Sequence, residues 1–311
     1  MKNALLLYIK GIAMGAADVV PGVSGGTIAF ITGIYEELLR SIGAIPGAAV
    51  HLARGRVREA WQAANANFLL ILAAGVLTSV FSLARLITYL LEQHPIPLWS
   101  FFFGLILVSV HLVGKEIQRW GLSRIVALAL GVVFAYVITV AAPVQWSSDG
   151  WSLFLAGAIA ICAMILPGIS GSFILVLLGL YPVVLSAVRD LELGTLAIFA
   201  GGCLVGLLSF ARLLGWMLRH WRDITLAFLT GLMLGSLNKV WPWKETLTWR
   251  TNSQGERTPV LEQNLSPDSF ASLTGQDPQL LLALLMAIGG IVLVLGLEWF
   301  AGRRQPMVQN V

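Results

Sequence analysis

Long apolar segments recur along the chain from one end to the other. Six of them approach or exceed the ~20 residues that a helix needs to cross a ~30 Å hydrocarbon core. They cover residues 67–92, 97–114, 122–142, 195–219, 223–240 and 279–301. A buried helix of a soluble protein is usually shorter than this. The hydrophobic pattern therefore predicts six transmembrane helices.

Two further apolar regions, 4–42 and 152–188, are each interrupted near the middle by a segment rich in proline, glycine and serine. The first break is residues 20–27 (VPGVSGGT) and the second break is residues 166–172 (LPGISGS). The arms beside each break contain about 12–16 residues, or roughly 18–24 Å of helix, which is too short to span the membrane. Non-helical backbone is tolerated at membrane depth only where protein or a cavity surrounds it. We therefore predict two re-entrant hairpins, each turning at its break.

The two halves of the chain are similar in sequence. The matching pairs of segments are 21–25 with 167–171, 33–35 with 179–181, 82–86 with 209–213 and 104–107 with 231–234. The number of residues that separates the two members of a pair decreases once along the chain. The first half therefore contains extra residues, around 51–60. Self-similarity of this kind indicates a repeated architecture. Each half, residues 1–142 and residues 151–304, is therefore predicted to contain one hairpin and three transmembrane helices.

The positions of basic residues predict how the two halves are oriented. If the N-terminus is cytoplasmic and each hairpin returns to its own side, most basic residues fall in cytoplasmic loops. These residues are Arg54, Arg56, Arg58, Lys115, Arg119, Arg124, Arg219, Arg222, Arg303 and Arg304. The opposite side receives the polar segment 241–278, interpreted as a loop, and the arrangement satisfies the positive-inside rule. Because three spans per half is an odd number, the second half is inverted. The predicted fold is an all-α polytopic membrane protein with an inverted repeat and two cytoplasmic termini.

Composition excludes several other classes of protein. Hydrophobic residues make up 57% of the 311 residues and charged residues only 12%, whereas soluble domains carry about 25% charged residues. The net charge of +4 is spread over short loops, so no basic face for nucleic acid is predicted. Cys162 and Cys203 lie in apolar segments without metal-ligand spacing, and the histidines are scattered. No metal and no cofactor are predicted.

The two breaks are the first candidates for a binding site. Backbone N–H groups at a helix break form a concavity that attracts anions, and neighbouring hydroxyl groups add donors. The candidate phosphate-binding residues are Ser24, Gly25, Gly26, Thr27, Ser170, Gly171 and Ser172, next to the breaking residues Pro21, Gly22, Pro167 and Gly168. The alternative is that these small residues only let helices pack closely. Two breaks at matching positions favour a binding site, because transporters bind substrates at such breaks.

Arg85 and Arg212 are the second candidates, because they occupy matching positions in the two halves. Each lies roughly 10–12 Å from the nearer end of its predicted span. An arginine deep in the membrane costs at least ~2.5 kcal/mol, and its guanidinium matches the oxygens of a phosphate. We therefore predict that both bind the anion. The alternative is that they snorkel to the membrane surface or pair with Asp18 or Glu36.

Asp18, Glu36 and Glu37 are the acidic residues closest to the first break. They are candidates for coupling transport to a proton or a sodium ion. In the alternative interpretation they only balance an arginine. The second half has Met164 and Pro182 at the positions of Asp18 and Glu36. Any coupling through these acids is therefore restricted to the first half.

The segment at residues 11–27 (GIAMGAADVVPGVSGGT), followed by residues 33–38 (GIYEEL), closely resembles the bacterial polyprenyl-phosphate (undecaprenyl-phosphate) transporter family. The resemblance extends through the second break and covers most of the chain. It implies a lipid transporter, or flippase, that returns undecaprenyl phosphate from the outer to the cytoplasmic leaflet of the bacterial inner membrane. This lipid carries precursors of the cell wall and of surface polysaccharides. The implied partners are the lipid, the phospholipid bilayer and a coupling proton or sodium ion.

A fainter similarity to undecaprenyl-diphosphate phosphatases supplies the main alternative. Those enzymes also have Pro-Gly-x-Ser breaks in inverted repeats, but theirs continue with Arg-Ser and depend on paired glutamates. This chain has Gly25-Gly26 and Gly171-Ser172 at those places, and Asp18 is the only acid just ahead of the first break. Without that arginine, no group in the break stabilises the charge of a transition state, and without the acid pair no groups are present for acid–base catalysis. We therefore predict no enzymatic activity, and a small-anion transporter is the remaining alternative.

Overall fold

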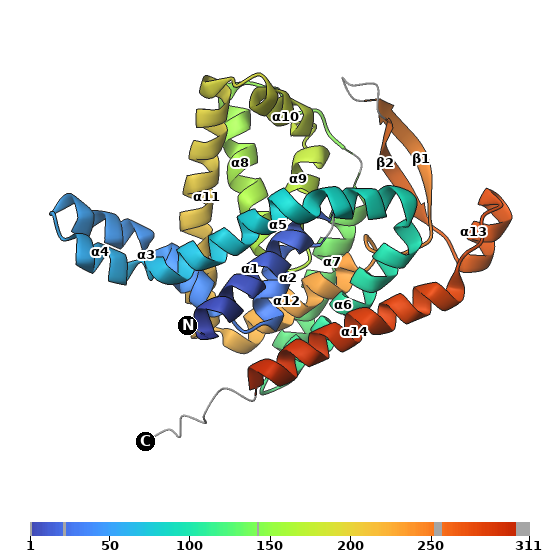
Figure 1. The fold of residues 1–311 in the computed structure, drawn as a ribbon, viewed down its shortest axis with the longest axis horizontal. Helices are drawn as coiled ribbons and strands as arrows, with labels where there is room; N and C mark the ends of the chain where they lie inside the picture. Colours follow the sequence, from blue (N-terminus) through green and yellow to red (C-terminus); the bar gives the residue numbers. More distant parts are fainter. Residues whose placement is uncertain (1, 21–22, 142, 252–256, 303–311) are drawn as a thin grey trace.

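The computed structural model describes residues 2–20, 23–141, 143–251 and 257–302. Five helices in this part of the chain are long and apolar enough to cross a membrane. The bent pair α9 (Gly171–Leu177) and α10 (Tyr181–Arg189) makes a sixth span if it is counted as one. The five are α5 (Ala66–Gln93), α6 (Pro95–Lys115), α7 (Leu122–Val140), α11 (Leu193–His220) and α14 (Leu280–Gly302). These helices confirm a mainly helical, multi-pass membrane protein (Figure 1).

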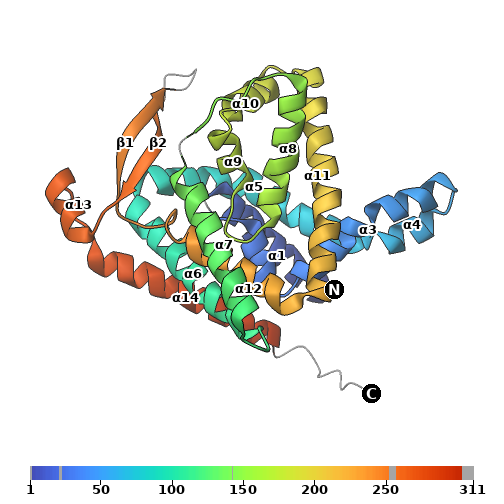
Figure 2. The ribbon, with the colours of Figure 1, turned by 180° about the vertical axis from the view of Figure 1, so that it is seen from behind.

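The remaining predicted span, 223–240, corresponds to α12 (Arg222–Ser236), which is shorter than predicted. Its 15 residues give roughly 22 Å of helix. Large side chains along α12 are fully buried, namely Leu226, Leu229, Leu232 and Met233. A helix buried over most of its surface is typical of a protein core. Both α6 and α7 pack against α12, and α7 covers it in the rear view (Figure 2).

Each predicted hairpin region contains a short central helix. The first region is α1 (Lys2–Val19), α2 (Gly25–Ile31) and α3 (Tyr35–Ala53), followed by α4 (Val57–Ala63), and the second is α8 (Gly150–Ile165), α9 (Gly171–Leu177) and α10 (Tyr181–Arg189). After the short helix the chain turns at a glycine with positive φ, 71° at Gly33 and 72° at Gly179. Residues other than glycine rarely adopt this conformation. The turn bends α10 by 112° from α9.

The long helices pack in equivalent pairs. Helix α1 packs along α5, and its equivalent α8 packs along α11. In the same way, α6 packs along α14, and its equivalent α12 packs along α7. Glycines allow the close approach, because a Cβ added at Gly104 would collide with the Ala287 backbone and one added at Gly290 with the Phe101 backbone. In lipid, such close packing is a main source of helix association. The two halves are interlocked, since α6 and α7 each pack against a helix of the other half.

The polar segment 241–278 has secondary structure that the sequence pattern did not predict. Strands β1 (Lys244–Thr251) and β2 (Arg257–Asn264) pair antiparallel, and helix α13 (Pro267–Thr274) follows. The indole N–H of Trp241 donates to the carbonyl oxygen of Leu265 (2.8 Å), and that of Trp243 to the carbonyl oxygen of Pro278 (2.9 Å). A small sheet is therefore added to the predicted all-α fold, at one edge of the helical bundle (Figures 1 and 2).

Candidate functional site

The two breaks meet in the protein interior and are joined by hydrogen bonds. The backbone N–H of Gly168 donates to the Thr27 Oγ1 (3.0 Å), and the Ser24 Oγ donates to the carbonyl oxygen of Met164 (2.8 Å). The side chains of Ser24 and Thr27 are fully buried. The structure therefore brings together two segments that lie far apart in the sequence and that the repeat singled out.

The first break satisfies its own backbone groups. Ser24 is the N-cap of α2, with φ −124° and ψ 135°, and its Oγ accepts a hydrogen bond from the Gly26 N–H (3.0 Å). The Asp18 Oδ1 accepts a hydrogen bond from the Gly25 N–H (2.6 Å). A Cβ added at Gly26 would collide with the carbonyl oxygen of Ile165. The described part of the first break is therefore a close-packed contact in this conformation. The predicted breaking residues Pro21 and Gly22 lie outside the described residues.

The second break leaves one of its hydroxyl groups at the surface. Gly168 has a φ of 87° and packs closely against α12, and Pro167 beside it is buried. The Oγ atoms of Ser170 and Ser172 lie 2.9 Å apart. Ser170 and Gly171 are buried, whereas Ser172 is exposed. Among the predicted phosphate-binding residues of the breaks, Ser172 is the one that a ligand can reach from outside.

Arg85 of α5 and Arg212 of α11 are both exposed. The Arg212 Nε donates to the carbonyl oxygen of Gly43 in α3 (2.9 Å). Across the described ranges, no hydrogen bond or ion pair joins either arginine to a break, to Asp18 or to Glu36. In this conformation, the structure therefore does not bring the two arginines into contact with the other predicted phosphate-binding residues.

Glu36 and Glu37 have partners of their own at the start of α3. The Glu36 carboxylate is bonded to the Arg222 guanidinium, which also donates to the Glu116 Oε2 (2.9 Å). The Glu37 Oε1 accepts a hydrogen bond from the Asn65 Nδ2 (2.8 Å). Glu36 thus balances an arginine, as the alternative interpretation has it. That arginine is Arg222, which the sequence pattern placed only in a cytoplasmic loop.

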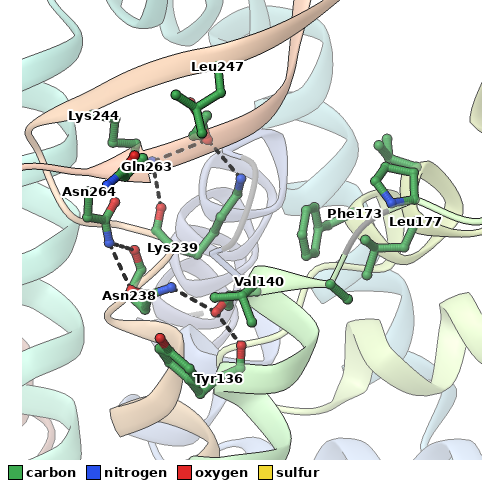
Figure 3. A pocket seen from close by; sticks show the side chains of 15 residues that line it. Tyr136, Val140, Phe173, Leu177, Asn238, Lys239, Lys244, Leu247, Gln263 and Asn264 are labelled. Atoms are coloured by element: carbon green, nitrogen blue, oxygen red, sulfur yellow. Dashed lines mark hydrogen bonds and ion pairs between the residues drawn. The ribbon is translucent and has the colours of Figure 1, made fainter.

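A further candidate region is a pocket of about 360 Å³ between α7, α9, the end of α12 and the two strands. Three charged side chains line this pocket, those of Lys239, Lys244 and Glu262. The Glu262 Oε2 lies 2.9 Å from the Lys239 Nζ and 3.8 Å from the Lys244 Nζ. The side chains of Asn238 and Asn264 lie beside the lysines (Figure 3). The pocket therefore holds a compact group of charges on one side of the bundle.

The pKa values of two of these groups are shifted, that of Lys244 by burial and that of Glu262 by the neighbouring lysines. Burial lowers the pKa of Lys244 to about 8, against the opposing effect of the Glu262 carboxylate. Burial by itself would raise the pKa of Glu262, but the two neighbouring ammonium groups outweigh it and hold this pKa below its ordinary value. The Glu262 carboxylate is therefore ionised at neutral pH, while Lys244 loses its proton more easily than an exposed lysine.

Sequence reasoning missed this pocket, because its charged residues come together only through strand pairing. Lys244 pairs with Asn264 in the register of the two strands, which places Glu262 near the start of β1. A local signal for a strand does exist, since residues 246–250 (TLTWR) alternate between polar and apolar side chains. That signal predicts the strand but not its partner.

Comparisons with known proteins indicate the family. A family model described as undecaprenyl phosphate translocase-like matches residues 14–258. A polyprenyl-phosphate transporter from Vibrio cholerae serotype O1 is 55% identical over 300 residues, which cover 96% of this chain and 97% of that protein. A polyprenyl-phosphate transporter from Staphylococcus aureus is 34% identical over 253 residues, 75% of this chain and 85% of that protein. No solved structure matches significantly. The chain therefore belongs to the undecaprenyl phosphate translocase-like family.

Proposed function

We propose that this protein transports undecaprenyl phosphate from the outer to the cytoplasmic leaflet of the bacterial inner membrane. Two relatives similar over most of the chain are named polyprenyl-phosphate transporters. The observation that carries the proposal is the hydrogen-bonded contact between the two breaks inside a bundle of membrane-length helices. Transporters bind substrates where helices are broken. A phosphate headgroup needs such a site, because an unpaired anion is very costly to place in hydrocarbon.

The transport cycle in this proposal uses an inverted repeat. The similarity between the helix pairs supports the repeat, since the pair α1 and α5 matches the pair α8 and α11, and the pair α6 and α14 matches the pair α12 and α7. The positive-φ glycines at matching positions, Gly33 and Gly179, support it as well. Two inverted copies give a transporter related conformations that open to opposite sides of the membrane. The breaks are in contact in this conformation, so passage of the headgroup requires the bonds of Ser24 and Thr27 to open.

The hydroxyl and amide groups of the breaks would bind the headgroup, with Arg85 and Arg212 as counter-charges. Both arginines are exposed, and they occupy matching helices. The bond from Arg212 to the carbonyl oxygen of Gly43 is one that a phosphate can replace, since a guanidinium binds phosphate oxygens through two parallel bonds and opposite charges. Ser172 is accessible before the breaks separate, so it would make the first contact at the second break.

Coupling to a proton or a sodium ion would offset the membrane potential. A potential that is negative inside opposes inward movement of an anion by ~2.3 kcal/mol per charge per 100 mV. Asp18 is the candidate that touches the first break, through its bond to the Gly25 N–H. Glu36 and Glu37 are bonded to Arg222 and Asn65 instead. Asp18 is therefore the strongest of the three candidates for coupling.

Transbilayer movement of labelled undecaprenyl phosphate in proteoliposomes tests the proposal. We expect the wild type to move the lipid and the Arg85→Ala/Arg212→Ala variant to move it at least about tenfold more slowly. A tenfold effect corresponds to losing ~1.4 kcal/mol of interaction with the phosphate, which is within the range of one hydrogen bond to a charged group.

A matched control removes two other exposed arginines, in the variant Arg56→Ala/Arg189→Ala, and we expect it to transport at the wild-type rate. Wild-type transport by the Arg85→Ala/Arg212→Ala variant would exclude the two arginines from the site. If the wild type moves no undecaprenyl phosphate under any imposed pH, sodium or voltage gradient, the transport function is rejected. Release of phosphate from undecaprenyl diphosphate would favour the phosphatase alternative.

A further inference from the structure

Among the described residues, the pocket beside the two strands carries more positive than negative charge. The Lys239 Nζ donates to the Glu262 Oε2 (2.9 Å), and the Lys244 Nζ lies 3.8 Å from the same oxygen. The side chains are largely buried, with exposed fractions of 17% for Lys239, 8% for Lys244 and 20% for Glu262. Two ammonium groups thus share one carboxylate. A buried excess charge is costly unless an ion of opposite sign compensates it.

Aromatic side chains hold the two ammonium groups in place. The Lys244 Nζ lies 4.0 Å from the ring centroid of Trp99, and the Lys239 Nζ lies 4.8 Å from that of Phe173. Both arrangements are favourable cation–π contacts. The Lys244 Nζ also donates to the carbonyl oxygen of Lys239 (2.7 Å). The positive groups are therefore positioned before any ligand arrives, which reduces the entropy that binding costs.

Amide and hydroxyl groups complete a polar lining. The Asn238 Nδ2 donates to the Thr139 Oγ1 (2.9 Å), and the Asn264 Nδ2 donates to the main-chain and side-chain oxygens of Asn238 (2.8 and 2.9 Å). Figure 3 shows these bonds on the same side of the pocket as the two lysines. Such a lining can orient a small anion with several oxygen atoms. The volume of about 360 Å³ suits a phosphate group but not a long polyprenyl chain.

The pocket is adjacent in sequence to the second break. Phe173, Val176 and Leu177 of α9 line it, and Phe173 directly follows the exposed Ser172. The apolar residues Val140 and Pro143 also line it. A phosphate held by the two lysines would therefore lie beside the helix that carries the second break, with apolar side chains around it.

We propose that this pocket is a binding site for a phosphate monoester or free phosphate, held by the ammonium groups of Lys239 and Lys244. If the ligand is a lipid headgroup, this proposal rests on the proposed function. The pocket would then be a docking site that the headgroup occupies before it reaches the second break. In the predicted topology the pocket faces the outside of the cell. The Glu262 carboxylate neutralises part of the positive charge of the two lysines until the ligand displaces it.

Binding of inorganic phosphate to the purified full-length protein, followed by calorimetry, is the direct test. We expect the Lys239→Gln/Lys244→Gln variant to bind at least about tenfold more weakly, because it removes both positive partners of the anion. The Glu262→Gln variant is expected to bind about fivefold more tightly, because it removes the competing carboxylate. The control Lys115→Gln/Arg119→Gln removes two exposed positive charges elsewhere and should bind like the wild type.

Thermal unfolding shows which variants are folded, and the Glu262→Gln arm remains informative if the lysine variant is not. The proposal is overturned if the wild type binds no phosphate, if a folded lysine variant binds as the wild type does, or if Glu262→Gln does not tighten binding. Competition by undecaprenyl phosphate in nanodiscs would identify a lipid headgroup as the ligand, and binding without such competition would identify free phosphate.

The transport assay separates this proposal from the proposed function. If the protein binds phosphate through the two lysines but moves no lipid, the binding-site proposal stands and the transport function is rejected. If the protein moves lipid but its folded lysine variant binds phosphate as the wild type does, the transport function stands and the binding-site proposal is rejected.

Binding of phosphate is also expected to depend on pH. The pKa of Lys244, lowered by burial to about 8, means that its charge is lost as the pH rises through about 8. The other titratable groups that line the pocket are Lys239, Glu262 and Tyr136. A phosphate monoester gains its second charge near pH 6, so the affinity for such an ester should be highest between about pH 6 and pH 8. A titration series of the binding constant of a soluble phosphate monoester checks this, and an affinity that rises above pH 8 would contradict it.

Discussion

Substituting Gly26 with alanine should abolish transport and lower the stability of the folded protein by about 3 kcal/mol, the upper part of the range for overpacking in a core. The added Cβ would collide with the carbonyl oxygen of Ile165. That oxygen belongs to the backbone at the end of α8, so a side-chain rotation cannot relieve the collision. The two breaks would have to separate, and the hydrogen bonds between them would be lost.

The matched control is Gly289→Ala in α14. An added Cβ at Gly289 meets no atom within 4 Å, and alanine favours a helix over glycine by about 1 kcal/mol. We expect Gly289→Ala to transport normally and to unfold at the same or a slightly higher temperature. Thermal unfolding in detergent and transport in proteoliposomes measure both effects. Equal behaviour of the two variants would show that the breaks are not packed as described.

Substituting Thr27 with valine should have the second largest effect. Valine has nearly the shape of threonine, but it cannot accept the hydrogen bond from the Gly168 N–H. A buried donor left without a partner costs about 1–3 kcal/mol. Because this bond joins the two breaks, we expect slower transport together with a lower unfolding temperature.

The conservative variant Thr27→Ser separates the hydrogen bond from packing. Serine keeps the oxygen that accepts from Gly168 but loses a buried methyl group, at a cost of about 1 kcal/mol. We expect Thr27→Ser to transport close to the wild-type rate although it is less stable. If Thr27→Ser and Thr27→Val transport equally slowly, the methyl group rather than the hydrogen bond is what the site needs.

The membrane helices are predictable because their signal is local. A helix that crosses a hydrocarbon core must be apolar over about 20 residues, and α5 and α11 begin and end within a few residues of the predicted spans. The end of α12 was missed, since the turn at residues 237–240 includes apolar side chains that a hydropathy pattern cannot distinguish from helix. Proline and glycine identified both breaks, because these residues interrupt helices for stereochemical reasons.

The contacts across the bundle are not predictable in the same way. The bond between Thr27 and Gly168 joins residues 141 positions apart, and no local pattern encodes such a pairing. Arg85 and Arg212 were predicted at the site from their matching positions in the two halves, their depth and the chemistry of the guanidinium group, and nothing in the sequence shows which residues they contact. A membrane helix is apolar on all sides, so its sequence gives no direct sign of which face turns inward. The two lysines of the pocket were missed for a related reason, since a strand pairing brings Lys244 near Glu262.

The exchange of partners between the halves has a consequence for biosynthesis. Helix α6 belongs to the first half of the chain, but it packs along α14, which leaves the ribosome about 165 residues later in the sequence. Domains of most proteins fold as units during synthesis, beginning at the N-terminus. Here the first half cannot complete its packing while the second half is still being translated. The packing of α6 in the membrane is therefore completed only when α14 inserts, and a nascent chain that stops before α14 leaves α6 without this partner.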